Sequence, residues 1–357
     1  MVLQHNRKNE HVSLSQKFHG DERDSSFHDL QFVHHSLPMI DVEEVSLETK
    51  IGNLSLQAPF FINAMTGGSP WTKKVNEKLA IVARETNLAI ATGSVSAGLK
   101  TPEVADSYRI VREVNPHGLV FANLGAGHGL ENAKKAVDLL QADAFQIHVN
   151  APQEVVMPEG DRTFRDWLSN IEEIVEGLDV PVIVKEVGFG MSRETIAQLR
   201  SVGVEHIDIS GTGGTNFAQI ENYRRREDKM DDIEEWGQST AVSLLEAASF
   251  LPEMTLISSG GIRRPIEVAK SLALGASAVG VSSHFLHFVL REGVDETIQI
   301  IEAWKKELTR MMTLLSTPSV SQMNRTDLVI KGDTRDWCEA RDINWKAYAK
   351  RSTNSSI

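Results

Sequence analysis

The chain has 357 residues, of which 41% are hydrophobic and 24% charged, as is typical of a globular protein with a substantial buried core. Its formal net charge of −12 argues against general nucleic-acid binding, and no apolar run is long enough to predict a membrane-spanning helix. The single cysteine, Cys338, excludes an intramolecular disulfide and a cysteine-cluster metal site. The basic N-terminus lacks the apolar stretch of a secretion signal, so we expect a cytoplasmic protein.

A repeating unit organises most of the chain. Residues 1–57 are polar and show no clear period, which predicts an irregular N-terminal arm and lead-in. From residue 58 to residue 357, short apolar runs alternate with helical patterns. Eight such runs begin near residues 58, 88, 119, 144, 182, 206, 255 and 278. They predict a closed (β/α)8 TIM barrel of the α/β class with a C-terminal helical extension. An open doubly wound sheet fits less well, because no early Gly-x-Gly-x-x-Gly run opens a helix.

Two further segments carry separate predictions. After the sixth run, a glycine-rich stretch at 212–216 is followed by a charge-rich stretch at 224–232. The charges predict a mobile, solvated loop over the top of the barrel. Towards the C-terminus, residues 299–315 and 333–349 have helical patterns and are expected to pack outside the barrel or to close its bottom.

Glycine-containing turns follow the last two predicted strands. Gly260 and Gly261 precede Pro265, which suits the first turn of a helix, and Gly280 lies in a run that ends at Ser282. Backbone N–H groups and helix N-termini at such turns can hold a phosphate, and this is where (β/α)8 barrels commonly bind one. Either turn alone could be ordinary βα geometry. Together they favour a phosphate-bearing cofactor.

Polar residues at the ends of the other strands narrow the choice of cofactor. They include small, amide, hydroxyl and cationic groups, which suit the flat polar rings of flavin mononucleotide (FMN). Lys185 ends an apolar strand and would be costly to bury without an anion such as the edge of a reduced flavin, although a lysine that reaches the rim is the alternative. Glu154 is the best candidate ligand for Mg²⁺, which prefers oxygen ligands shared with phosphates. His148 and Asn150 are expected to share one face of their strand, with a structural histidine as the alternative.

A cationic cluster lies near the N-terminus. Arg7, Lys8 and His11 have a spacing that can gather three donors on one turn, which suits a multiply charged phosphate. A simple basic tail is the alternative interpretation.

These motifs, taken in order, resemble those of the type 2 isopentenyl-diphosphate isomerase family, FMN-dependent enzymes of isoprenoid biosynthesis, over essentially the whole chain. The matching segments are Arg7-Lys-Asn-Glu-His, Ala64-Met-Thr-Gly-Gly, Gly93-Ser, Ala122-Asn-Leu-Gly, His148-Val-Asn-Ala-Pro-Gln-Glu, Val184-Lys-Glu, Ser210-Gly-Thr-Gly-Gly-Thr, Ser259-Gly-Gly-Ile-Arg and Leu328-Val-Ile. Some members carry Gln-Arg after the Gly-Ser motif, where this chain has Val95-Ser96 and so lacks one cation.

The resemblance implies roles for individual residues. The expected flavin contacts are Ala64, Met65, Thr66, Ser94, Asn123, Lys185, Ser210, Thr215, Gly260, Gly261, Arg263, Gly280, Val281 and Ser282. The expected substrate contacts are Arg7, Lys8, His11, Ser94, Asn150 and Gln153, with Gln153 near the reacting carbons. Gln153 and His148 are the candidate catalytic residues, and Glu154 would bind Mg²⁺. Relatives assemble as tetramers or octamers, so we expect a homo-oligomer.

The reaction that the resemblance implies converts isopentenyl diphosphate into dimethylallyl diphosphate without net redox change, so NADPH would serve only to reduce the flavin. The nearest alternative is an FMN-dependent 2-hydroxy-acid oxidoreductase, but such enzymes carry His-Gly-Gly-Arg after the strand that here ends at Ser210. An IMP-dehydrogenase-like barrel needs a cysteine in a top-face loop, whereas Cys338 lies far past the eighth strand. A non-catalytic flavin- or phosphate-binding protein is the remaining alternative.

Overall fold

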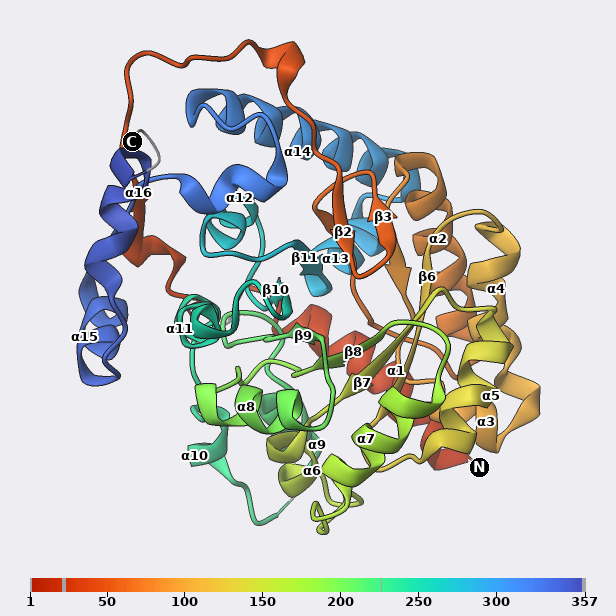
Figure 1. Ribbon diagram of the computed structural model, residues 1–357. Coiled ribbons are helices and arrows are strands. Elements are labelled where there is room, and N and C mark those ends of the chain that lie inside the picture. The colour runs from red at the N-terminus through yellow and green to blue at the C-terminus, as the bar shows by residue number, and fades with distance from the viewer. Residues whose placement is uncertain (1, 21–23, 226, 355–357) are drawn as a thin grey trace.

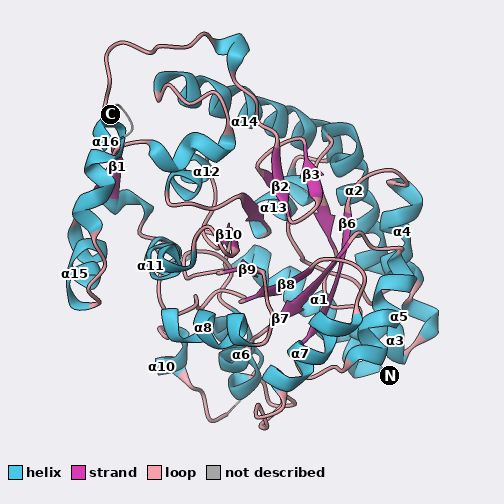
Figure 2. Ribbon diagram, viewed as in Figure 1, coloured by secondary structure: helices cyan, strands magenta, loops and turns pink. Residues whose placement is uncertain are grey.

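Eight parallel strands close into a barrel, and each pairs with its neighbours in chain order (Figures 1 and 2). The structure is a computed structural model and describes residues 2–20, 24–225 and 227–354. The barrel strands are β4 (Phe60–Ile62), β5 (Ile90–Ala91), β6 (Val120–Gly125), β7 (Ala144–His148), β8 (Val182–Lys185), β9 (His206–Asp208), β10 (Thr255–Ser259) and β11 (Ala278–Val281). The pairing of β11 with β4 closes the barrel. The predicted TIM barrel is therefore confirmed.

Helices surround these strands on the outside (Figure 2). The longer ones are α2 (Pro70–Thr86), α4 (Asp106–Val114), α5 (Leu130–Leu140), α7 (Trp167–Gly177), α8 (Arg193–Ser201), α11 (Thr240–Ala247), α12 (Pro265–Ala273), α13 (Ser283–Arg291) and α14 (Val294–Leu314). In α2, the side chain of Ser69 caps the helix by accepting a hydrogen bond from the backbone N–H of Thr72 at 3.1 Å. One face of this helix is apolar, and Val75, Leu79 and Val82 are buried there.

Short helices follow several strands and bring side chains to one end of the barrel. They are α3 (Ser96–Lys100), α6 (Ala151–Val156), α9 (Phe217–Arg224) and α10 (Asp231–Glu234). The segment at 224–232 is therefore not simply a solvated loop, as the sequence predicted. The end of α9 and the start of α10 lie inside it, and its first residue, Arg224, is paired with carboxylates.

A hairpin closes the opposite, N-terminal end of the barrel. It consists of β2 (Thr49–Ile51) and β3 (Leu54–Leu56), joined by a turn in which Gly52 has φ +57°. Ile51 and Leu56 are buried in one cluster with the inward-facing Phe61 and Phe121. The interior of the barrel is thus apolar at this end, which leaves the other end for polar groups.

The N-terminal segment is helical, so the prediction of an irregular arm is wrong for α1 (Val2–Lys17). This helix packs against α2, α9 and α13 (Figure 1). Its sequence lacks a clear apolar stripe, and several of its contacts are polar: Asn9 accepts from Ser69, His11 contacts Glu221, and Gln16 contacts His287, while Val12 is buried. Tertiary contacts therefore explain a helix that periodicity did not predict.

The C-terminal part packs on the outside. The helix α14 contacts α2, α12 and α13, and β12 (Leu328–Ile330) pairs antiparallel with β1 (Leu30–Phe32). The helix predicted at 333–349 is interrupted: α15 (Gly332–Ala340) ends before Asp342, whose φ of +54° is left-handed, and a separate 3-10 turn precedes α16 (Arg351–Asn354). Within the described residues, no helix is both long and apolar enough to span a membrane.

Candidate active site

A cavity of about 830 Å³ lies at the C-terminal end of the barrel, beneath α1. Most of the residues that the sequence indicated meet there. Those that line it are Arg7, Lys8, His11, Ala64, Met65, Ser94, Asn123, His148, Asn150, Gln153, Glu154, Lys185, Ser210, Thr215, Gly260, Gly261, Arg263, Gly280 and Ser282. Thr66 and Val281 do not line it. Thr66 is buried next to it, and Val281 belongs to the apolar core.

The turns after β9 and β10 are pressed together at one side of the cavity. Gly260 and Gly261 have φ of +93° and +75°, and a Cβ atom on Gly260 would collide with the carbonyl oxygen of Gly211. Arg263 donates a hydrogen bond to the carbonyl oxygen of Gly213 at 2.6 Å, which ties the two turns together. Close backbone packing therefore explains why these positions are glycine, and it leaves main-chain groups lining the cavity.

Lys185 is the buried cation of the site. Its side chain is 6% exposed, and its Nζ donates to the carbonyl oxygen of Glu186 at 3.0 Å. Burial lowers the pKa of Lys185, and the nearby Asp208 and Glu186 carboxylates offset part of that shift. Within the described chain, Lys185 forms no ion pair closer than 4 Å. An anionic ligand group would therefore complete its environment.

A row of polar side chains crosses the interior of the barrel below the cavity. Asn63 donates to Asp208 at 2.8 Å and accepts from Gln146 at 3.1 Å. Gln146 in turn accepts from Asn123 at 3.1 Å, and the Oδ1 atom of Asn123 lies 2.8 Å from Nδ1 of His148. Burial, with Lys185, Lys8 and His128 nearby, lowers the pKa of His148 to about 3. His148 is therefore neutral at neutral pH.

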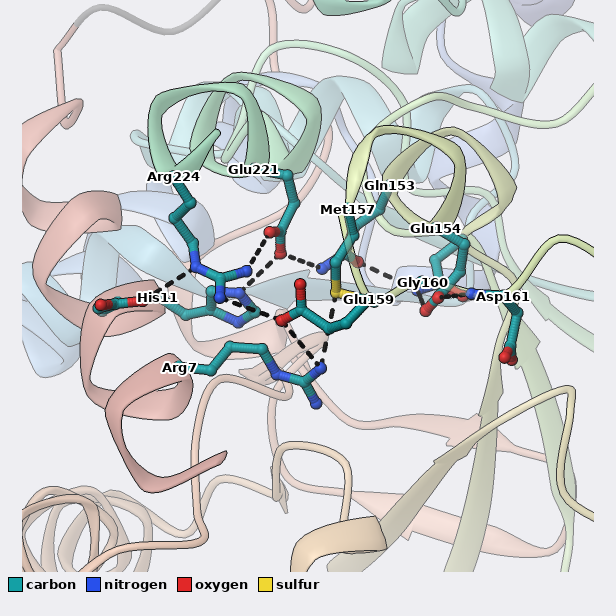
Figure 3. A network of polar contacts seen from close by, with 12 residues as sticks. Arg7, His11, Gln153, Glu154, Met157, Glu159, Gly160, Asp161, Glu221 and Arg224 are labelled. Carbon is teal, nitrogen blue, oxygen red and sulfur yellow. Dashed lines mark hydrogen bonds and ion pairs between the residues drawn. The ribbon is translucent and has the colours of Figure 1, made fainter. Parts of the chain in front are cut away.

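At the mouth of the cavity, charged side chains from distant segments form a network (Figure 3). Glu221 of α9 is fully buried and lies 2.8 Å from Nε2 of His11 on α1. It also pairs with Arg224 and accepts a hydrogen bond from Gln153 at 3.3 Å. Although burial opposes ionisation, the contacts with His11 and Arg224 hold the pKa of Glu221 below its usual range. Glu221 thus joins the arm to α6 and α9.

Two further carboxylates extend this network towards solvent. Arg224 pairs with Glu10 of α1 at 2.9 Å and with Glu159 at 3.0 Å, and Glu159 lies 3.7 Å from Arg7. Lys8 lines the cavity without an ion pair among the described residues, and burial together with Arg7 lowers its pKa to about 8. Lys8 is therefore the cation of the mouth that is most open to an anion.

Glu154 stands beside this network as the predicted metal ligand. Its Oε1 atom accepts from the side chain of Asn150 at 2.8 Å, and its Oε2 atom accepts from the backbone N–H of Asp161 at 2.8 Å. Over the described ranges, no three His, Cys, Asp or Glu side chains gather closely enough to hold a metal ion. A metal ion at Glu154 would therefore take further ligands from bound phosphate oxygens or water.

The sequence did not indicate several residues of the site, among them Gln146, Asp208, Glu221 and Arg224. One signal was available for Gln146, because an amide in the middle of the buried strand β7 needs a partner. Glu221 gave no local signal, since its partner His11 is 210 residues away.

Comparisons with known proteins agree with this geometry. The family model of FMN-dependent dehydrogenases matches residues 122–330. The isopentenyl-diphosphate delta-isomerase of Staphylococcus saprophyticus is 48% identical over 338 residues, which are 95% of this chain and 97% of that protein. The isopentenyl-diphosphate delta-isomerase of Latilactobacillus sakei is 48% identical over 342 residues, which are 96% of this chain and 98% of that protein.

Solved structures of flavoenzymes are similar in fold. A mutant flavocytochrome b2 with benzoylformate has a TM-score of 0.62 at 19% identity, covering 89% of this chain and 80% of that one. Mandelate oxidase with (S)-2-phenylpropionate has a TM-score of 0.62 at 18% identity, covering 90% of each chain. At such low identity, this likeness shows the fold alone.

Proposed function

This chain belongs to the isopentenyl-diphosphate delta-isomerases, within the wider family of FMN-dependent dehydrogenases, and we therefore propose that it interconverts isopentenyl diphosphate and dimethylallyl diphosphate in isoprenoid biosynthesis. Its cofactors would be reduced FMN and Mg²⁺, with NADPH as the reductant of FMN. The observation that carries the proposal is the cavity in which the cations of α1 face the glycine turns and polar strand ends of the barrel.

The residues of the cavity fit FMN on three observations. The glycine turns bring main-chain groups to the cavity, and Lys185 lines it without an anionic partner within 4 Å in the described chain. The Oγ1 atom of Thr66, which is buried next to the cavity and does not line it, has no hydrogen-bond partner among the described residues. The FMN phosphate would bind at the turns, and the ring system along the strand ends. The residues that would hold FMN are Ala64, Met65, Thr66, Ser94, Asn123, Lys185, Ser210, Thr215, Gly260, Gly261, Arg263, Gly280, Val281 and Ser282.

The substrate diphosphate would bind under α1. Arg7, Lys8 and His11 come from one helix and line one wall of the cavity, so their donors can converge on a single polyanion. Ser94 and Asn150 would supply uncharged donors. Mg²⁺ would bind Glu154 together with diphosphate oxygens, because one carboxylate shared with a phosphate is a usual Mg²⁺ site.

These residues also meet the physical requirements of the reaction. The isomerisation adds a proton at one carbon and removes another two carbons away, with no net redox change. When bound, reduced FMN supplies a ring nitrogen that can give and take a proton. The diphosphate contacts use remote binding energy to position the alkene, and α1 limits the access of water to it. Gln153 is uncharged and 9% exposed, so it can orient the alkenyl group without placing a fixed charge beside it.

The competing activity is oxidation of a 2-hydroxy acid by FMN. Two catalytic residues expected for that chemistry are missing after β9, where the chain reads Ser210-Gly-Thr-Gly-Gly-Thr. The homo-oligomer, as a tetramer or octamer, and the cytoplasmic location remain predictions. Light scattering of the purified protein tests the first of these.

The test of the function is an anaerobic assay of the FMN-loaded protein with isopentenyl diphosphate, Mg²⁺ and NADPH. We expect dimethylallyl diphosphate in large molar excess over the NADPH consumed, because each flavin needs to be reduced only once. Absence of the product, or consumption of one NADPH per product, would contradict an isomerase without net redox change. Oxidation of a 2-hydroxy acid by the same preparation would favour the competing activity.

A further inference from the structure

The row of amides inside the barrel is the feature that the function described so far does not use. It runs from Asp208 through Asn63, Gln146 and Asn123 to His148. Its members come from β9, β7 and β6, except that Asn63 directly follows β4. Asp208, Asn63, Gln146 and Asn123 are each at most 2% exposed. Buried groups of this kind have to match donor to acceptor at every contact.

The orientation of the first amide is fixed by the main chain. The backbone N–H of Ala64 donates to Oδ1 of Asn63 at 2.9 Å. A backbone N–H can only donate, so the acceptor end of this side chain must point there. The NH2 end of Asn63 then faces Oδ2 of Asp208 at 2.8 Å.

The anchor at Asp208 agrees with this assignment. Its carboxylate also accepts from the Oγ hydroxyl of Ser259 at 2.6 Å and from the backbone N–H of Ser210 at 3.2 Å. In its ionised form Asp208 can only accept from these three neighbours. Burial raises the pKa of Asp208, and Lys185, Ser259 and Asn63 act against that shift, so the backbone contact of Ala64 sets the orientation of Asn63 and the contact with Asp208 is consistent with it.

The direction set at Asn63 passes along the row. Because its Oδ1 atom is an acceptor, the group of Gln146 that faces it must be the NH2 group, 3.1 Å away. The Oε1 atom of Gln146 is then left to accept from the NH2 group of Asn123 at 3.1 Å. The Oδ1 atom of Asn123 faces Nδ1 of His148 at 2.8 Å. An oxygen cannot donate, so Nδ1 must carry the proton of the neutral ring.

The other ring nitrogen is directed to open space. Gly125 pairs with His148 across β6 and β7, and a Cβ atom on Gly125 would lie 3.0 Å from Nε2 of His148. Both residues line the cavity, so the missing side chain keeps Nε2 accessible. In the neutral ring this nitrogen has a lone pair, which repels the oxygen of an anion.

The groups around the ring decide when it can take up a proton. Burial is the largest cause that lowers the pKa of the His148 ring, and Lys185 from β8, Lys8 from α1 and His128 from the segment after β6 add to it in the ligand-free protein. A polyanion bound at Lys8 would offset these charges. It would also offer oxygens to which a protonated Nε2 could donate.

We propose that the amide row holds His148 as its Nδ1–H tautomer in the ligand-free enzyme and that binding of the substrate diphosphate places one proton on Nε2. Nδ1 keeps its hydrogen bond to Asn123 throughout, so the ring gains a donor for the anion without turning. Gln146 touches neither the ligand nor His148 and acts as a positioning residue. The inference rests on the proposed function, because it takes the ligand to be a diphosphate.

The test counts protons by calorimetry. The full-length, FMN-loaded protein is titrated with inorganic pyrophosphate in buffers that differ in enthalpy of ionisation. A His148→Asn variant should take up about one proton fewer per site than the wild type, because it lacks the group that titrates. The difference between the two proteins cancels the protons that pyrophosphate itself exchanges.

A second variant tests the row itself. Gln146→Met keeps the length of the side chain but removes the oxygen that accepts from the NH2 group of Asn123. The Asn123 amide can then turn over, so both tautomers of His148 can form. Proton uptake should then fall between the values of the wild type and His148→Asn. The control is Ser258→Ala, which also removes a fully buried hydrogen-bonding group, a hydroxyl bonded to Ser271 at 2.9 Å, and should leave proton uptake unchanged.

The outcomes separate the inference from the proposed function. Tight pyrophosphate binding with equal proton uptake in the wild type and His148→Asn would overturn the inference and leave the diphosphate site standing. No binding of pyrophosphate to the wild type would overturn both. If a variant loses FMN or does not fold, neutron diffraction of the wild-type holoenzyme decides: deuterium on Nδ1 of His148 and none on Nε2 supports the assignment, and deuterium on Nε2 contradicts it.

Discussion

The mouth and the floor of the cavity are built in opposite ways. At the mouth, charged side chains come from α1, α9 and the segment after α6 (Figure 3). Arg224 by itself pairs with three carboxylates, those of Glu10, Glu159 and Glu221. The floor is the row of buried polar side chains from Asp208 to His148, in which each side chain contacts the next in a fixed order. The mouth can exchange its ion pairs for contacts with an anion, whereas the floor cannot rearrange without leaving a buried polar group unpaired.

The comparison also shows where each region is vulnerable. At the mouth, pairs such as Arg7 with Glu159 are partly exposed, and such pairs contribute little stability. Glu221 is the exception, because it is fully buried and its loss would leave His11 and Arg224 without their shared carboxylate. On the floor, the direction of the whole row depends on every member.

The largest loss of activity is expected from a substitution of Glu154, which lies beside the network at the mouth. Glu154→Gln keeps the shape and the acceptor but removes the charge that would hold Mg²⁺. We expect kcat/KM to fall by about 100-fold or more, since a bound metal contributes several kcal/mol of charge stabilisation. FMN content should not change. Kinetics over a Mg²⁺ titration check this, and an unchanged dependence on Mg²⁺ would remove Glu154 from the metal site.

The next effect concerns the buried centre of the mouth. Glu221→Gln should lower the free energy of unfolding by about 2 kcal/mol and speed proteolysis within α1, because Arg224 loses its buried carboxylate and His11 loses the charged form of its hydrogen-bond partner. Glu10→Gln is the matched control: it contacts the same Arg224 but is half exposed, so we expect a loss of less than about 1 kcal/mol. Thermal unfolding and limited proteolysis measure both, and equal effects would show that burial does not distinguish the two carboxylates.

A smaller effect is expected from pH at Lys8, whose pKa is lowered to about 8 by burial and Arg7. Above pH 8 the free enzyme loses this cation, so the affinity for pyrophosphate should fall by up to about tenfold per pH unit beyond the change intrinsic to the ligand. In Lys8→Arg the cation persists, because guanidinium does not titrate in this range. Calorimetric titration between pH 7 and pH 9.5 compares the two proteins, and parallel curves would contradict the assignment of Lys8.

The last effect is a pH dependence of stability that arises from His148 in the amide row. The pKa of His148 is lowered from 6.5 to about 3, chiefly by burial, so below pH 6.5 the unfolded chain binds a proton here that the folded chain does not. His148 should therefore make stability fall with falling pH, by at most about 1.4 kcal/mol per pH unit. Denaturant unfolding between pH 4.5 and pH 7 should show a shallower slope for His148→Asn than for the wild type.

The sequence predicts the barrel well because its signals are local. Each strand is a short apolar run, and glycines next to small residues predict the turns at Gly260 and Gly280. The sequence does not predict the helix of the arm, because α1 carries no apolar stripe and several of its contacts are side-chain hydrogen bonds to distant segments, such as those of Asn9 with Ser69 and Gln16 with His287. The network at Glu221 was missed for a related reason, since ion pairs between distant segments leave no periodicity in the chain.

The row of amides on the floor is partly predictable from the sequence, unlike the barrel, which is well predicted, and the network at Glu221, which is not predicted. An amide such as Gln146 inside an apolar strand indicates that a buried polar contact exists, but not which groups make it. The barrel register decides that, by placing Asn123 beside Gln146 and Lys185 beside Asp208 on neighbouring strands. The residue types were therefore visible in the sequence, whereas the direction of the row required the structure.

The most direct test of this account is a crystal structure of the full-length protein with FMN, Mg²⁺ and isopentenyl diphosphate. We expect the diphosphate against Arg7, Lys8 and His11, the FMN phosphate at the turns that contain Gly260 and Gly280, and the alkenyl group between them next to Gln153. A diphosphate bound away from α1, or an FMN phosphate bound away from the two glycine turns, would contradict the division of the cavity into a charged mouth and a fixed floor.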